Sequence, residues 1–161
     1  MARTDNHIRI TPSVLDRLID YDPRESRESP KSRSTSLLEL KASVRRDLEW
    51  LLNTRTFLDP EDFDSTEIKD SVAVYGLPDI TGLSAQNRDE QMQVLRSVEH
   101  AIRVFEPRFL NLKVTMEPPT DTERSIQFRI EAQLDVDPAP EPIVFDTVLK
   151  LGSCDFEIKE K

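Results

Sequence analysis

The sequence predicts an α+β fold, in which two main amphipathic helices pack on a mostly antiparallel sheet of about four strands. Three observations lead to this prediction. Apolar residues recur every three or four positions in two long segments, residues 36–52 and 87–106. The final third of the chain instead alternates apolar and polar residues in short runs. Helices followed by a run of strands are typical of an α+β domain.

Composition indicates one domain of ordinary size with polar extensions. The chain has 161 residues, of which 37% are hydrophobic and 33% charged. Its net charge of -9 disfavours nucleic acid and anionic membranes as partners. Cys154 is the only cysteine, which excludes an internal disulfide and suits a reducing compartment. Because we find neither a signal peptide nor an apolar run near the roughly 20 residues of a membrane span, we expect a cytoplasmic protein.

An extended N-terminal arm is predicted for residues 1–35, and a single folded domain for residues 36–161. Within the arm, residues 20–35 are nearly all charged, Pro or Ser and are typical of a flexible linker. An apolar patch precedes this linker, with the spacing of one or two helical turns: Val14, Leu15, Leu18 and Ile19. Such a patch docks either on its own domain or on another chain, and its residues leave both alternatives open.

The first long helix is predicted to begin at a capping box formed by Ser36 and Glu39. One apolar stripe follows, at steps of three and four residues: Leu37, Leu40, Val44, Leu48 and Leu51. Trp50 falls off this stripe. It therefore packs against a flank of the domain or anchors a partner.

The segment after this helix is predicted to be a loop, followed by a short strand over residues 71–75. Gly and Pro in residues 76–79 then indicate a turn. The chain contains only three glycines, so we expect Gly76 to serve a backbone need, either a positive φ or a close approach.

The second long helix is predicted to begin near Asn87 and to end at Phe105 or Glu106, because Pro107 cannot continue it. Its apolar stripe consists of Met92, Leu95, Val98, Ile102 and Phe105. Glu106 and Arg108 are therefore presented at a rigid corner between a helix and a strand.

Strands are predicted where the apolar period changes to two. The runs are residues 110–116, 126–134 and 143–151, with a short fourth strand containing Cys154, Phe156 and Ile158 at an edge of the sheet. In the first run, Leu110, Leu112, Val114 and Met116 are expected to share the buried face. An edge strand offers a template for pairing with another chain.

The Glu106 corner is suited either to recognising a partner or to positioning a carboxylate for chemistry. Glycoside hydrolysis needs two carboxyl groups, one with a raised pKa. Arg108 would instead favour the ionised form of Glu106, and the sequence singles out no second carboxylate. His7 and His100 are interpreted as surface residues, and no pattern indicates a metal or cofactor site. We expect no catalysis; the alternative is a peptidoglycan-cleaving, lysozyme-like glycosidase with Glu106 as general acid.

The order of these motifs resembles the TssE family. The resemblance rests on residues 13–18, the helix of residues 43–55, residues 71–79 and the tripeptide Glu106-Pro107-Arg108, and it spans about residues 12–158. TssE is the baseplate wedge subunit of type VI secretion systems and is related to a small baseplate protein of contractile-tailed phages.

The resemblance implies a structural role at the cytoplasmic side of the inner membrane. The expected partners are the wedge subunits TssF, TssG and TssK and the sheath subunits TssB and TssC, with no direct membrane insertion. An open sheet edge, from the C-terminal strands or the N-terminal arm, would help to start the sheath by strand addition. Alanine at Glu106 or Arg108 is expected to leave folding largely intact and to weaken recruitment. The residues expected to bind partners are Glu106, Pro107, Arg108, Leu15, Arg17, Leu18, Tyr75, Gly76, Leu77 and Pro78.

Overall fold

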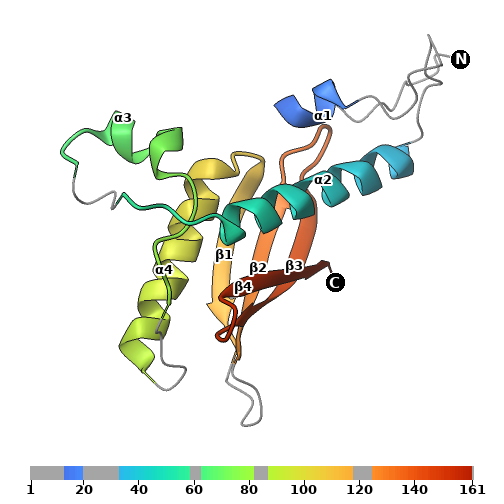
Figure 1. Ribbon diagram of the computed structural model, residues 1–161. Helices are drawn as coiled ribbons and strands as arrows, with labels where there is room; N and C mark the ends of the chain where they lie inside the picture. The colour runs from blue at the N-terminus through green and yellow to red at the C-terminus, as the bar shows by residue number, and fades with distance from the viewer. Residues whose placement is uncertain (1–12, 20–32, 59–62, 82–86, 118–124, 161) are drawn as a thin grey trace, which may run out of the picture.

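The computed structural model describes residues 13–19, 33–58, 63–81, 87–117 and 125–160 (Figure 1). Helices occupy the first part of the described chain and strands the last. The helices are α1 (Val14–Leu18), α2 (Arg33–Asn53), α3 (Thr66–Lys69), the 3₁₀ helix η2 (Val72–Val74) and α4 (Arg88–Phe105). The strands are β1 (Phe109–Met116), β2 (Ser125–Leu134), β3 (Glu141–Lys150) and β4 (Asp155–Glu160).

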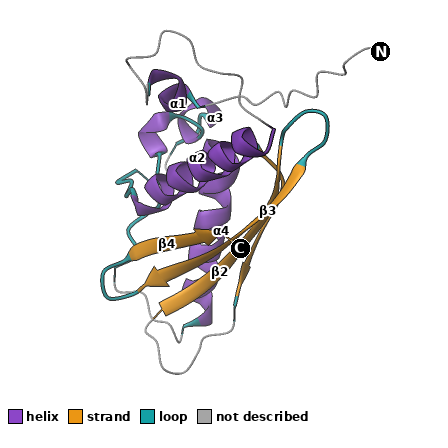
Figure 2. Cartoon of the chain, turned by 90° about the vertical axis from the view of Figure 1, so that its right-hand side faces the viewer, coloured by secondary structure: helices purple, strands orange, loops and turns teal. Residues whose placement is uncertain are grey.

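The four strands form one antiparallel sheet in the order β1-β2-β3-β4. Its inward face carries the apolar half of each alternating strand, including Ile126, Phe128 and Ile130 of β2, which are all buried. The two long helices cover this face, with α2 beside β4 and α4 beside β1 (Figures 1 and 2). The predicted α+β class and the sheet of four strands are therefore confirmed.

Helix α2 begins earlier than the sequence pattern suggested. Its first residue is Arg33, so Ser36 lies inside the helix and the predicted capping box at Ser36 and Glu39 is wrong. Residues 33–35 of the predicted linker are helical, while residues 20–32 lie outside the described part of the chain. The apolar stripe is confirmed from Leu40 to Leu51, whose inward side chains are buried in the common core.

A 3₁₀ helix replaces the strand predicted for residues 71–75. The Ser71 hydroxyl accepts a hydrogen bond from the Ala73 N–H, and this local bond favours a helical turn over an extended chain. Val72 and Ala73 are exposed and only Val74 is buried. The apolar run therefore faces no sheet.

Helix α4 agrees closely with its prediction. Asn87 is the N-cap, its side chain accepts from the Asp89 N–H, and Glu106 is the C-cap. The buried side chains are Val94, Val98, Ala101 and Ile102, however, and Met92 at the start of the predicted stripe is exposed. The stripe is thus rotated toward Val94 at its N-terminal end.

Strand β1 contains an irregularity that its alternating apolar and polar sequence did not predict. Asn111 adopts a positive φ of 54°, and the register with β2 shifts between Leu110 and Lys113. This bulge reverses the phase, so that Leu110 is exposed while Val114 is buried. Leu110 was expected on the inner face, and that expectation is wrong.

Strand β4 lies at the edge of the sheet, as predicted. Cys154 belongs to the preceding turn rather than to the strand, and its φ of 58° is typical of a turn residue. Its carbonyl oxygen accepts a hydrogen bond from the guanidinium of Arg55. In the described residues, no helix is both long and apolar enough to cross a membrane.

Candidate functional site: the charged corner

Glu106 and Arg108 form a bidentate ion pair at the corner between α4 and β1. Arg108 donates from Nε to Oε1 of Glu106 over 2.6 Å and from Nη2 to Oε2 over 2.5 Å. The Glu106 side chain is only 4% exposed, and Arg108 is 15% exposed. The pair is therefore an intramolecular, largely buried one rather than a pair of surface charges.

Helix α2 supplies further partners for the same guanidinium. Arg108 Nη2 lies 2.7 Å from Oδ2 of Asp47, and Nη1 donates to the Ser43 hydroxyl over 3.3 Å. Burial alone would lower the pKa of Arg108, but the bonds to Glu106 and Asp47 raise it. Arg108 thus stays charged and joins the corner to α2.

The chain of charges continues from α2 to the N-terminal helix α1. Arg46 Nη2 is 2.8 Å from Oδ1 of Asp47 and 2.8 Å from Oδ1 of Asp16 on α1. The Ser43 hydroxyl donates to Oδ2 of Asp16 over 2.5 Å. We call the set of Asp16, Ser43, Arg46, Asp47, Glu106 and Arg108 the corner network.

Asp16 is held in its ionised form by this arrangement. Partial burial would raise its pKa, but hydrogen bonds from Ser43, Arg46 and Ser13 outweigh that effect and lower the pKa from 3.8 to about 2. Ser13 and Asp16 also form a reciprocal capping box that closes the first turn of α1. The apolar patch predicted before the linker thus docks on its own domain through a carboxylate.

The residues predicted to bind partners fall into different environments. Pro107 is exposed, Leu15 is half-buried and Leu18 is 77% exposed, whereas the side chain of Arg17 lies outside the described residues. Their contacts with other subunits stay predictions. Within the corner network, Glu106 and Arg108 already interact with each other and with α2.

Residues 75–78 have mainly structural environments. Gly76 has a φ of +113°, and a Cβ there would lie 2.6 Å from the backbone oxygen of Thr54, so both predicted backbone needs are present. Leu77 is fully buried and exchanges backbone hydrogen bonds with Thr54 and Thr56. Tyr75 packs edge-on against Phe105 at 5.1 Å. Burial and the charges of Asp47 and Glu106 raise the pKa of Tyr75.

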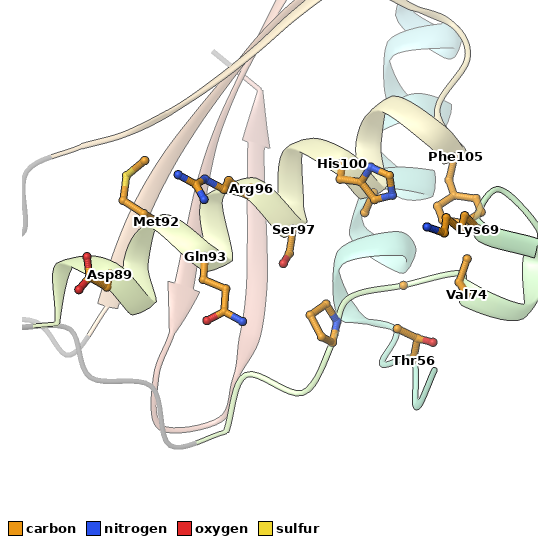
Figure 3. A pocket seen from close by; sticks show the side chains of 13 residues that line it. Thr56, Lys69, Val74, Asp89, Met92, Gln93, Arg96, Ser97, His100 and Phe105 are labelled. Atoms are coloured by element: carbon orange, nitrogen blue, oxygen red, sulfur yellow. The ribbon is translucent and has the colours of Figure 1, made fainter. Parts of the chain in front are cut away.

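An open groove of about 820 Å³ separates α4 from the segment of residues 74–78 (Figure 3). Pro78 and Gly76 contribute to one wall. Asp89, Gln93, Ser97 and His100 are presented along α4 on the other side, with Phe105 and Lys69 together at one end. The groove accounts for the exposure of Met92, which lines it instead of joining the core.

The corner does not offer the geometry that a glycosidase needs. Both carboxyl oxygens of Glu106 accept from Arg108, and the side chain has almost no contact with solvent. A general acid must reach the oxygen of a leaving group. Among the described residues, no cluster of His, Cys, Asp and Glu is placed to hold a metal ion.

Comparison with known families decides how this fold should be interpreted. The family model described as baseplate wedge protein gp25 matches residues 38–139, which is well over half of the chain. The chain belongs to this family. The match covers most of α2, all of α4 and the Glu106 corner, and the predicted TssE-like relationship agrees with it. No curated protein matches the chain.

Membership in the gp25 baseplate wedge family indicates a structural role in a phage tail-like baseplate and interactions with other baseplate components. The corner network connects three motifs that the sequence kept apart: residues 13–18, the α2 segment and the Glu106 tripeptide. Sequence reasoning missed Asp16, Ser43, Arg46 and Asp47 as members of one site. The available signal was the position of Ser43 and Asp47, each one residue before a member of the buried apolar stripe of α2, so that polar side chains border the face that packs on the core.

Proposed function

We propose that this chain is a TssE-type wedge subunit of a type VI secretion machine, which joins other wedge subunits to the base of the contractile sheath. The family assignment supports the structural role. The single observation that carries the sheath part of the proposal is the four-stranded sheet with an open outer edge at β1. We further propose that the protein acts in the cytoplasm, at the inner membrane.

The outward backbone groups of β1 follow from its register. The Glu117 N–H donates to the Gln127 oxygen, so alternate residues of β1 before it face β2. The intervening residues Val114 and Met116 therefore direct their N–H and C=O groups away from the sheet. No hydrogen bond joins these groups to another described residue. This edge presents two outward residues for pairing with an added strand.

The opposite edge is partly closed by a side chain of α2. Asn53 donates from Nδ2 to the Phe156 oxygen over 3.1 Å, and its Oδ1 accepts from the Phe156 N–H over 2.8 Å. The amide thus satisfies the first outward pair of β4 as a neighbouring strand would. We therefore assign strand addition by the sheath to β1 rather than to β4.

Substitution of one outward residue tests this assignment. Met116→Pro removes a free N–H from the edge of β1 and leaves the hydrogen bonds between β1 and β2 in place. We expect it to stop the chain from promoting polymerisation of TssB and TssC, while circular dichroism remains that of a folded protein. Unchanged polymerisation with a folded Met116→Pro chain would contradict the assignment.

Asn53→Ala is the matched variant for the other edge, because it exposes the backbone groups of Phe156. We expect it not to increase sheath polymerisation. Co-purification of the unaltered chain with TssF and TssG tests the wedge role separately, and absence of binding to either would overturn that role. A fluorescent fusion is expected to form foci at the cell envelope only when the other wedge subunits are present.

A further inference from the structure

Helix α1 is docked on the rest of the domain through the Asp16 carboxylate. Oδ1 accepts from Arg46 and Oδ2 from the Ser43 hydroxyl, both on α2. These two donors form what we call the carboxylate cradle. Asp16 is the residue of α1 whose side chain makes the ion pair with α2 in the described structure.

The other described apolar side chains of residues 13–19 add little packing. Leu18 is 77% exposed, and Leu15 and Ile19 are only half-buried. A helix of five residues is too short to be stable without tertiary contacts. Among the described side chains, the docking of α1 therefore rests mainly on the partly solvated Asp16 carboxylate and its bonds to Arg46 and Ser43, whose net contribution to stability is small.

The carboxylate cradle is not specific for its own chain. A guanidinium N–H and a serine hydroxyl bind any carboxylate that approaches in the same plane. Arg46 also pairs with Asp47, so the cradle binds through the alignment of its donors and not through an excess of positive charge. Arg108 donates to the same Ser43 hydroxyl, which makes the cradle continuous with the Glu106 corner.

We propose that the carboxylate cradle is a docking site for an acidic side chain of a neighbouring wedge subunit, and that Asp16 is its occupant in the free protein. Binding of the partner then displaces α1 from Ser43 and Arg46. This inference rests on the proposed function for the identity of the partner. Beyond that function, the inference names the recognised group, a carboxylate, and an intramolecular competitor for the same site, Asp16.

Substitution of Asp16 gives the central test. Asp16→Asn removes the charge of the competitor and is expected to tighten binding to a TssF–TssG complex about fivefold to tenfold, because a larger fraction of the chain is competent to bind. Asp70→Asn, which removes an exposed charge outside the network, is the matched control and should leave the affinity unchanged. Weaker binding by Asp16→Asn would overturn the proposal, since α1 would then be part of the binding surface.

The tighter binding expected for Asp16→Asn must also depend on the carboxylate cradle. Arg46→Gln removes its main donor, and we expect it to weaken binding and to cancel the effect of Asp16→Asn in the double variant. A gain of equal size in the Arg46→Gln background would contradict a shared carboxylate site.

A second experiment is independent of the wedge subunits. A synthetic peptide of residues 11–20 is titrated into the full-length Asp16→Asn chain, up to about the millimolar effective concentration of a short tether. We expect a saturable shift of the Arg46 Nε–H resonance, and no shift with the same peptide carrying Asn in place of Asp16. Absence of the shift would overturn exchange at the cradle, whereas failure of the unaltered chain to bind TssF–TssG would count only against the proposed function.

Discussion

Glu106 is a buried acid whose charge is balanced at each oxygen by Arg108. A buried ion pair of this kind adds little net stability over apolar residues, because desolvation opposes its attraction. Loss of one partner has a larger effect, since it leaves the other charge buried alone. The expectation that alanine at either position would leave folding largely intact was based on exposed charges, and the burial of Glu106 changes it.

Arg108→Ala tests how much stability depends on this buried ion pair. We expect it to lower the free energy of unfolding by about 3–5 kcal/mol, because Glu106 loses the guanidinium that balances its charge and donates to both of its carboxyl oxygens. Arg103→Ala, on the adjoining helix α4, is the matched control. Arg103 pairs with Glu99 in an exposed i,i+4 bridge, so its loss should change stability by less than about 1 kcal/mol. If urea denaturation gave the same loss of stability for Arg108→Ala and Arg103→Ala, the burial of the Glu106–Arg108 pair would not matter for stability.

Gly76 allows a second test at this scale. Gly76→Ala forces an L-residue to a φ of +113° and pushes Cβ against a backbone oxygen, so we expect a loss of more than about 1 kcal/mol. Gly152→Ala is the control, because no atom lies within 4 Å of the added Cβ. Thermal melts of the two variants should separate clearly. A neutral Gly76→Ala would show that the turn relaxes.

At the scale of elements, the docking of α1 should depend on pH. The folded-state pKa of Asp16, about 2, is below its usual 3.8, so its contribution to docking is complete above about pH 4 and is lost as the pH falls toward 2. We expect the amide resonances of α1 to shift in this window. Asp16→Asn should abolish the dependence, and persistence of the shift in that variant would assign it to another group.

The helices and strands show which structural features a sequence pattern predicts. β2 and α4 were predicted well because each has a long, regular apolar period that packing on the sheet reinforces. The 3₁₀ helix at Val72 was missed because three apolar residues suit a strand and a turn equally well. The first residue of α2 was missed because a capping box pattern also occurs inside helices.

The candidate site was only partly predictable for a physical reason. Pro107 identifies a helix end and so marks the corner from local sequence. Nothing local indicates that Asp16 reaches Arg46, since that contact joins residues separated by 30 positions and depends on how α1 docks. The burial of Glu106 likewise depends on Asp47 and Arg108 from different elements, and composition gives no sign of it.

At the scale of the whole molecule, the helices and the sheet share one core. Buried side chains from α2, α4 and all four strands belong to one cluster. We therefore expect unfolding to be a single cooperative transition. Far-UV circular dichroism and the fluorescence of Trp50 on α2 should report the same midpoint. Separate midpoints would indicate that α2 detaches before the sheet unfolds.

Strand β1 connects the edge proposed for sheath binding to the Glu106 corner. Its eight residues begin directly after Arg108, and its C-terminal half carries the outward groups to which we assign the sheath strand. If the sheath is attached there, tension during contraction is applied at Val114 and Met116 and is transmitted along the covalent backbone of β1 to the Glu106 corner. From Arg108 it passes through Asp47 into the long helix α2. The bulge at Asn111 is then the joint at which that tension changes direction.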